Sequence, residues 1–240
     1  MEILKLSNIY KNYIMGDVIV NALKDVSFSI EKGEFAALSG PSGSGKSTLL
    51  NLIGLIDVPS KGQIILNGKN IYEKITLKDN LTLSGKLDAS LTAIRRRELG
   101  FIFQNFNLTP VLNVEENVSI PLRLGPSRAT EEMNVSQRKE WVNYLIDKVG
   151  LTKWKGHKPS ELSGGQRQRV AVARALVTKA DIILADEPTA NLDQKNGEQI
   201  LELMKSLNEE LKTTFIFSTH DQKIVSMCNH VVKIMDGELV

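Results

Sequence analysis

Residues 40–47 read Gly40-Pro41-Ser42-Gly43-Ser44-Gly45-Lys46-Ser47. They match the pattern G-x-x-x-x-G-K-[ST], in which glycines allow backbone N–H groups to turn inward around phosphate oxygens. The apolar run Phe35 to Leu38 precedes this loop, and a helix is expected from about Lys46 to Ile56. In that strand–loop–helix context the helix N-terminus adds a positive dipole, Lys46 reaches the β and γ oxygens of a nucleotide, and Ser47 can ligate Mg²⁺. The competing fingerprint G-x-G-x-x-G fails because Thr48 stands where its third glycine would be, so a Rossmann dinucleotide site is rejected.

Composition limits the class of protein. A chain of 240 residues is expected to form one large domain, or a core with a smaller lobe. Its 42% hydrophobic and 24% charged residues are typical of globular proteins, and a net charge of +2 gives no reason to propose nucleic acid as the main partner. No hydrophobic run exceeds four residues and the N-terminus lacks a signal-peptide pattern, so we expect neither a membrane-spanning helix nor secretion. The single cysteine, Cys228, favours a reducing compartment.

The order of periodic segments predicts an α/β protein. The first forty residues alternate as strands do, and residues 63–66 continue this β-rich part. Strands expected at 181–185, 214–218 and 231–235 alternate with helices, which is typical of a parallel sheet. Between them Val142, Leu145, Ile146 and Val149 form a helical stripe, so a helical lobe is expected over about 105–178. Residues 73–93 are polar without a sustained period, and we interpret them as a surface insertion.

Two further segments carry chemistry. Ile182 to Glu187 is an apolar strand that ends in two adjacent carboxylates, which point in different directions because side chains alternate along a strand. Asp186 is then placed to bind Mg²⁺, and Glu187 to orient or deprotonate an attacking water. Ser163 is a good N-cap for a helix over Arg167 to Val177, and the glycines after it leave backbone N–H groups uncovered. This segment is a second anion-binding helix terminus, which one nucleotide does not obviously need.

Together the loop at 40–47, the pentapeptide Leu162–Gln166 and the pair Asp186-Glu187 resemble the nucleotide-binding subunit of an ABC transporter. The resemblance covers essentially the whole chain in the order of the family. It implies an α/β fold with a P-loop NTPase parallel-sheet core (1–104 and 179–240), an N-terminal antiparallel β subdomain and an inserted α-helical subdomain (about 105–178), all in one ABC ATPase domain over 1–240.

The resemblance also implies roles for single residues. Gln104 matches the Q-loop, which joins the core to the helical lobe, Asp193 belongs to the D-loop 191–193, and His220 matches the switch histidine. Tyr13 resembles the aromatic on which adenine stacks, with Tyr10 as its rival. The implied nucleotide-binding set is Tyr13, Gly40, Pro41, Ser42, Gly43, Ser44, Gly45, Lys46, Ser47, Thr48, Ser163, Gly164, Gly165, Gln166 and Asp193. The implied catalytic set is Lys46, Gln104, Glu187 and His220, and the implied magnesium set is Ser47, Gln104 and Asp186.

By the same resemblance, the chain binds and hydrolyses ATP with Mg²⁺ as a head-to-tail dimer. Each ATP lies between the phosphate loop of one subunit and the Ser-Gly-Gly of the other. A separate membrane permease is implied as partner, bound through the helical lobe near 105–118, which places the chain at the cytoplasmic face of the cell membrane. Residues 40–57, 99–121 and 157–166 resemble the lipoprotein-releasing and macrolide-export group.

Two alternatives stand beside this interpretation. A soluble ABC-type ATPase could act on nucleic acid or ribosomes, but such proteins usually carry paired ATPase units, a coiled-coil insertion or a zinc module, none of which is visible. A P-loop kinase or GTPase would share residues 40–47 but offers no reason for Leu162 to Gln166.

Overall fold

A computed structural model describes residues 1–73, 75–79, 81 and 84–240 of the chain. Its contacts divide the chain into two compact units. Unit 1 comprises Met1–Leu91 and Thr214–Val240, and unit 2 comprises Thr92–Thr213. Each unit is described by itself below.

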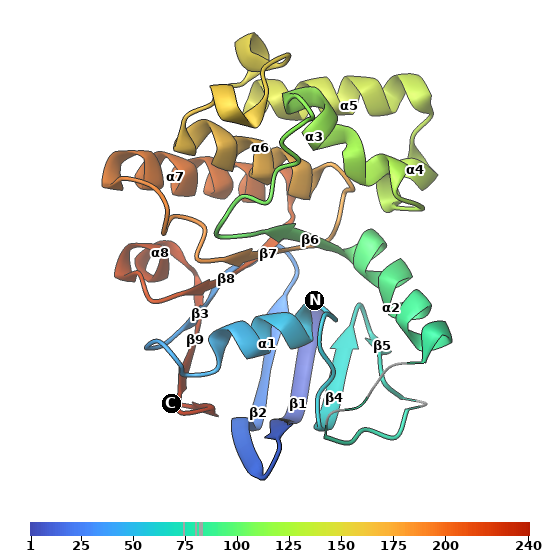
Figure 1. Ribbon diagram of the computed structural model, residues 1–240, viewed down its shortest axis with the longest axis vertical. Helices are drawn as coiled ribbons and strands as arrows, with labels where there is room; N and C mark the ends of the chain where they lie inside the picture. Colours follow the sequence, from blue (N-terminus) through green and yellow to red (C-terminus); the bar gives the residue numbers. More distant parts are fainter. Residues whose placement is uncertain (74, 80, 82–83) are drawn as a thin grey trace. The chain divides into compact units, whose positions relative to one another are not determined.

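Unit 1 begins with an antiparallel sheet, as expected from the alternation at the N-terminus. Its strand order is β2-β1-β4-β5, formed by β1 (Glu2–Met15), β2 (Val18–Glu31), β4 (Lys61–Leu66) and β5 (Lys69–Asn70). β1 and β2 run side by side as a long hairpin (Figure 1). Val26 and Ile30 of β2 are completely buried, because alternate side chains of a strand share one face and this face turns to the core.

The second part of unit 1 is built on parallel strands. β3 (Phe35–Ser39) pairs in parallel with both β8 (Thr214–Thr219) and β9 (His230–Met235), and β10 (Glu238–Leu239) adds an antiparallel edge. Every residue of β3 and β8 is buried, which fits the apolar runs Phe35–Leu38 and Phe215–Phe217 within them. Phe35 packs between neighbours there, with its ring centroid 4.6 Å from that of Phe217. Helices α1 (Lys46–Ile53) and α8 (Gln222–Met227) complete the unit.

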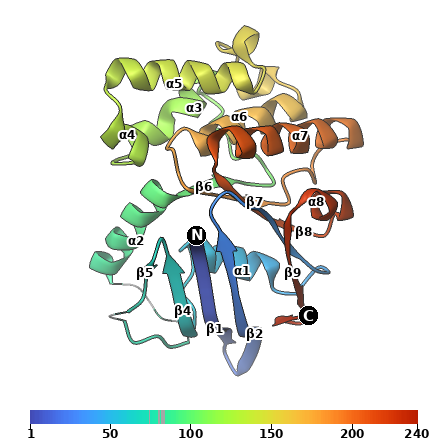
Figure 2. The ribbon, with the colours of Figure 1, turned by 180° about the vertical axis from the view of Figure 1, so that it is seen from behind.

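Unit 2 combines two parallel strands with a group of helices. β6 (Leu99–Ile102) pairs in parallel with β7 (Ile182–Asp186). The helices are α3 (Val114–Ser119), α4 (Arg128–Glu132), α5 (Val135–Lys148), α6 (Gly164–Leu176) and α7 (Gln194–Leu211), with 3-10 turns η1 (Ile120–Arg123), η2 (Thr152–Trp154) and η3 (Pro159–Glu161). α3, α5 and α6 pack together (Figure 2). Val142, Leu145 and Ile146 of α5 are buried as the predicted stripe.

The segment expected as a surface insertion contains a helix that the sequence did not predict. Residues 73–93 show no sustained period in the sequence, yet the structure has helix α2 over Gly85–Glu98. The physical reason is that only Leu91 of this helix is buried, so no apolar stripe marks it. Residues 74, 80, 82 and 83 of the expected surface insertion lie outside the described residues. The first helix also ends earlier than expected, at Ile53, because Leu55 takes left-handed backbone with φ 54°.

The predicted fold class is confirmed. Parallel strands with helices, an antiparallel β subdomain and a helical segment inserted in the chain between β6 and β7 are all present. Over the residues that the structure describes, no helix combines the length and apolar character needed to cross a membrane.

Candidate functional site

The loop between β3 and α1 has the backbone that its glycines predict. Gly43 and Gly45 have φ of 80° and 105°, in the left-handed region that favours glycine. A Cβ at Gly40 would lie 2.0 Å from the carbonyl oxygen of Ile234, so a side chain is excluded there. Gly45 is the N-cap of α1, and no side chain caps this helix end. The loop therefore presents an N-terminus whose backbone donors can serve an anion.

Lys46 is held inside this loop. Its side chain is 7% exposed, and Nζ donates to the carbonyl oxygens of Gly40, at 2.8 Å, and Pro41, at 2.7 Å. Ser44 Oγ is buried with no hydrogen-bond partner. Ser47, the next residue along α1, is exposed. A buried cation and an unpartnered hydroxyl beside an uncapped helix N-terminus fit a polyphosphate group and the metal ion that accompanies it.

His220 lies at the same edge of unit 1 as the phosphate loop. β3 and β8 pair in parallel with Ser39 opposite Thr219, so the residues that follow them, Gly40 and His220, leave the sheet together. Ligands of parallel α/β sheets bind at the carboxyl ends of the strands. The structure thus brings His220 and the start of the phosphate loop to one edge of unit 1.

Tyr13 of β1 also lies near the start of α1. Its hydroxyl donates to Asp57 Oδ2 at 2.8 Å, and its side chain also hydrogen-bonds to that of Thr48. Burial, and then the carboxylate of Asp57, raise the pKa of Tyr13 to about 12. Tyr10 is the other candidate for stacking on adenine. Its backbone oxygen accepts a hydrogen bond from the amide of Ser60. Asp57 escapes sequence reasoning because nothing local connects it with Tyr13.

In unit 2 the parallel pairing of β6 with β7 sets the acidic end of one strand beside the residue that follows the other. Ile102 is opposite Ala185, so Gln104 and the pair Asp186-Glu187 leave the sheet at the same edge. Asp186 Oδ1 is buried without a hydrogen-bond partner, which fits a carboxylate that awaits a cation. Glu187 has left-handed backbone with φ 43°.

The loop after β6 is tied to two other parts of unit 2. Asn191 Nδ2 donates to the carbonyl oxygen of Gln104 at 2.9 Å, which joins it to the loop before α7. Arg174 of α6 donates to the carbonyl oxygens of Phe106, at 2.6 Å, and Asn107. Desolvation lowers the pKa of Arg174, whose charge is here compensated by carbonyl dipoles. The sequence did not predict these two sets of hydrogen bonds, because the residues that they join lie far apart in the chain.

Ser163 is the N-cap of α6, as predicted. Its Oγ accepts from the amide of Gln166 at 3.3 Å, and Gln166 Oε1 accepts from the amide of Ser163 at 2.8 Å, which completes a capping box. Gly165 packs beneath α7, where an added Cβ would lie 3.1 Å from Asn196 Oδ1. Asp193 caps α7, and hydrogen bonds from Asn196 hold its pKa below the ordinary value. Unit 2 therefore carries Gln104, residues 163–166, Asp186, Glu187 and Asp193.

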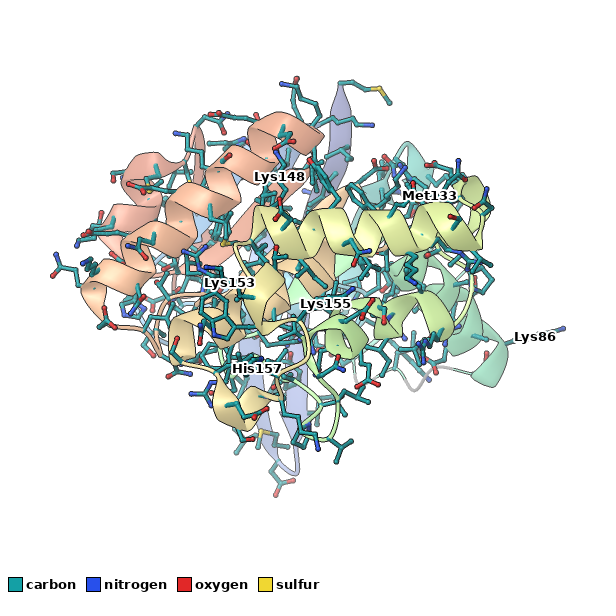
Figure 3. The ribbon with its side chains drawn as sticks, turned by 90° about the horizontal axis from the view of Figure 1, so that it is seen from above. Lys86, Met133, Lys148, Lys153, Lys155 and His157 are labelled. Carbon is teal, nitrogen blue, oxygen red and sulfur yellow. The ribbon has the colours of Figure 1, made fainter. Side chains whose placement is uncertain are left out.

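His157 belongs to neither group of residues. It is exposed and lies in the segment that follows α5, near Lys153 and Lys155 in sequence (Figure 3). Its backbone bonds to Trp154, at 2.9 Å, and to Val114, at 3.0 Å. These backbone contacts join the segment after α5 to the start of α3.

Comparison with known proteins gives consistent matches. The family model "ABC transporter" matches residues 23–190. MJ0796 of Methanocaldococcus jannaschii, an uncharacterized ABC transporter ATP-binding protein, is 43% identical over 98% of this chain and 94% of its own length. A dimeric structure of a post-hydrolysis state of that cassette, bound to ADP and Pi, superposes with a TM-score of 0.80 at 41% identity, covering 98% of this chain and 96% of that one.

Two further relatives carry functional names. Lipoprotein-releasing system ATP-binding protein LolD 1 of Rhodopseudomonas palustris is 39% identical over 99% of this chain and 98% of its own length. Macrolide export ATP-binding/permease protein MacB of Bdellovibrio bacteriovorus is 43% identical over 97% of this chain, which spans 32% of that longer protein. With a phosphate loop at the end of a parallel strand and matches over almost its full length, the chain belongs to the ABC transporter family, as one of its ATP-binding ATPase domains.

Proposed function

We propose that this ATPase works as a dimer of two copies that close around two ATP molecules and drive a separate membrane permease. The proposal of a dimer is supported by two helix N-termini that contain glycine and are suited to bind anions. One is Gly45 at the start of α1 in unit 1, and the other is Ser163 with two glycines at the start of α6 in unit 2. One nucleotide needs one such cradle for its phosphates, so the second is available for the nucleotide held by another copy.

The proposed roles follow the chemistry of each group. Lys46, which now donates to loop carbonyls, would transfer these hydrogen bonds to the β and γ phosphate oxygens of ATP. Ser47, Gln104 and Asp186 would hold the Mg²⁺ of the substrate. Glu187 would accept the proton of the attacking water. His220 would donate to the γ phosphate. Hydrolysis removes that phosphate, and the lost contact would no longer favour the closed dimer.

The shared site is tested by mixing two defective chains. Lys46→Ala removes the phosphate-loop cation, and Ser163→Phe blocks the α6 N-terminus, so each variant alone should hydrolyse ATP at a background rate. In a mixture, half of the dimers combine the two variants, and each of these has one site with no defect. About a quarter of the wild-type rate should return if the two sites act independently in a symmetric dimer.

Two controls make this measurement decisive. Lys46→Ala mixed with a Lys46→Ala/Ser163→Phe double variant contains no intact site and should stay at background. A Ser163→Phe chain that hydrolyses ATP normally by itself would contradict the shared site.

The proposal that a permease is the partner is supported by the relatives. LolD is named for a lipoprotein-releasing system and MacB for macrolide export, and MacB carries its permease in the same chain. Lipoprotein release or macrolide/peptide export by force transmission is therefore the proposed class of work, at the cytoplasmic face of the membrane. Unit 2 offers a groove of about 520 Å³ for such a partner, with both acidic and basic groups: Asn113, Glu115, Glu116, Ser119, Leu122, Arg123, Val135, Arg138, Lys139 and Val142.

The nucleic-acid alternative receives no support from these relatives. A pull-down with the full chain and detergent-solubilised membranes separates the two partner classes. Recovery of an integral membrane protein that stimulates ATP hydrolysis supports the permease. Recovery of RNA or DNA, with stimulation by it, would contradict the permease.

A further inference from the structure

A buried ion pair lies under the ring of Tyr13. Lys11, two residues earlier on β1, is 4% exposed, and its Nζ donates to Asp57 Oδ1 at 2.7 Å and to the carbonyl oxygen of Val58 at 2.8 Å. The same Nζ lies 4.7 Å from the centroid of the Tyr13 ring. Cations at this distance from a ring are attracted by its π electrons. One face of the Tyr13 ring is thus occupied by a fixed charge.

Asp57 holds both partners at once. One carboxylate oxygen accepts from Lys11 and from the amide of Val58, at 2.7 Å, while the other accepts from the Tyr13 hydroxyl at 2.8 Å. The Tyr72 hydroxyl donates to the Asp57 backbone oxygen at 3.4 Å. The carboxylate therefore restrains the phenol end of the ring, and Lys11 restrains its face.

The Tyr13 phenol keeps its proton at neutral pH. Burial and the neighbouring carboxylate raise the pKa of Tyr13 to about 12. The Tyr13 hydroxyl consequently remains a donor to Asp57 throughout the physiological range.

The surroundings of the ring show where it points. The Tyr13 side chain hydrogen-bonds to that of Thr48, which belongs to the helix that follows the phosphate loop. On the other side of the hairpin, Tyr13 is paired with Val20, and directly opposite residues of an antiparallel pair share one face of the sheet. Val20 is 44% exposed, so an apolar side chain lies open beside the ring.

We propose that Lys11 and Asp57 are positioning residues that fix the Tyr13 ring as a nucleobase platform and leave only the ring face away from Lys11 for the base. This inference rests on the proposed ATP site and on the assignment of Tyr13 to adenine that the resemblance to the family implies. The base then stacks on a ring whose opposite face carries a cation, with Val20 at its edge. Because the ring is restrained before the nucleotide arrives, less side-chain entropy is lost on binding.

Comparing ATP with inorganic triphosphate distinguishes a role in base binding from a general effect on the fold. Inorganic triphosphate occupies only the phosphate loop, whereas ATP also needs the platform. We expect Lys11→Met, which removes the charge and keeps a long side chain, to weaken ATP binding by about 5- to 10-fold, the range expected for lost stacking and cation–π contacts. Its dissociation constant for inorganic triphosphate should not change. In kinetics KM for ATP should rise while kcat is retained.

Calorimetric titration measures the binding of ATP and of inorganic triphosphate to the full chain. Three further variants are compared with Lys11→Met in this experiment. Lys5→Met is the matched control, because Lys5 lies on the same strand with an exposed side chain and should bind both ligands normally. Tyr13→Ala should weaken ATP binding by about 10-fold and leave triphosphate binding unchanged. Tyr13→Phe keeps the ring and the Lys11–Asp57 pair but loses the hydroxyl, so a smaller, ATP-specific loss is expected; it decides the question if Lys11→Met does not fold.

Each other outcome is informative. Normal ATP binding by Lys11→Met, with a loss in Tyr13→Ala, would overturn the positioning role and retain the platform. Normal ATP binding by both variants would remove the adenine assignment itself. Equal weakening of ATP and triphosphate by Lys11→Met would mean that the pair supports the phosphate loop, which also contradicts the proposal.

Discussion

Gly100 shows how a single position can be restricted by the approach of another backbone. An added Cβ on this residue of β6 would lie 2.5 Å from the carbonyl oxygen of Ala175 in α6 and 2.5 Å from Ile183 Cδ1 of β7. Gly100→Ala should therefore lower the stability of the protein by about 1–3 kcal/mol, the usual cost of overpacking, measured by thermal or urea unfolding. Gly156→Ala is the control, since nothing lies within 4 Å of its Cβ position. Equal unfolding midpoints for the two variants would contradict this close approach.

Helix α7 has an acidic residue, Asp193, as its N-cap. Hydrogen bonds from the backbone amide and the side chain of Asn196 lower the pKa of Asp193. A carboxyl whose pKa is lower in the folded state stabilises the protein above its unfolded pKa, and this contribution is lost as the pH falls through the folded value.

The melting temperature of wild type should therefore exceed that of Asp193→Ala at neutral pH, and the difference should shrink below about pH 4. Asp193→Asn supplies a cap without a titrating charge, so its difference from Asp193→Ala should not change between pH 7 and pH 3. A wild-type difference that is independent of pH would show that the carboxylate charge does not contribute.

At the scale of the whole molecule, the proposed dimer predicts that the molecular mass in solution depends on which nucleotide is bound. Glu187→Gln removes the proposed general base, so ATP should remain bound and hold two copies together. With MgATP this variant should elute at about twice 26.6 kDa, and its turnover should fall by about 10²- to 10⁴-fold. With MgADP it should elute as a single chain, and adding Lys46→Ala should abolish the dimer in MgATP. Near-normal turnover would remove Glu187 from the mechanism.

Local patterns were sufficient for much of this protein. The phosphate loop, the N-cap at Ser163 and the carboxylates that end β7 follow from the types and spacing of neighbouring residues. The parallel sheet was predictable because strand segments alternate with helical segments along the chain. Helix α2 was not, since with only Leu91 buried its sequence lacks the stripe by which amphipathic helices are recognised.

Contacts between distant parts of the chain required the folded structure. Lys11 and Asp57 are 46 positions apart in the sequence. Asn191 and Gln104, which are joined by a hydrogen bond, are 87 positions apart. Periodicity and capping act over one or two turns of the backbone, so they carry no information about such pairs. Motifs could therefore locate the phosphate-binding chemistry, while the surroundings of the Tyr13 ring arise from strand pairing and packing that bring separate segments together.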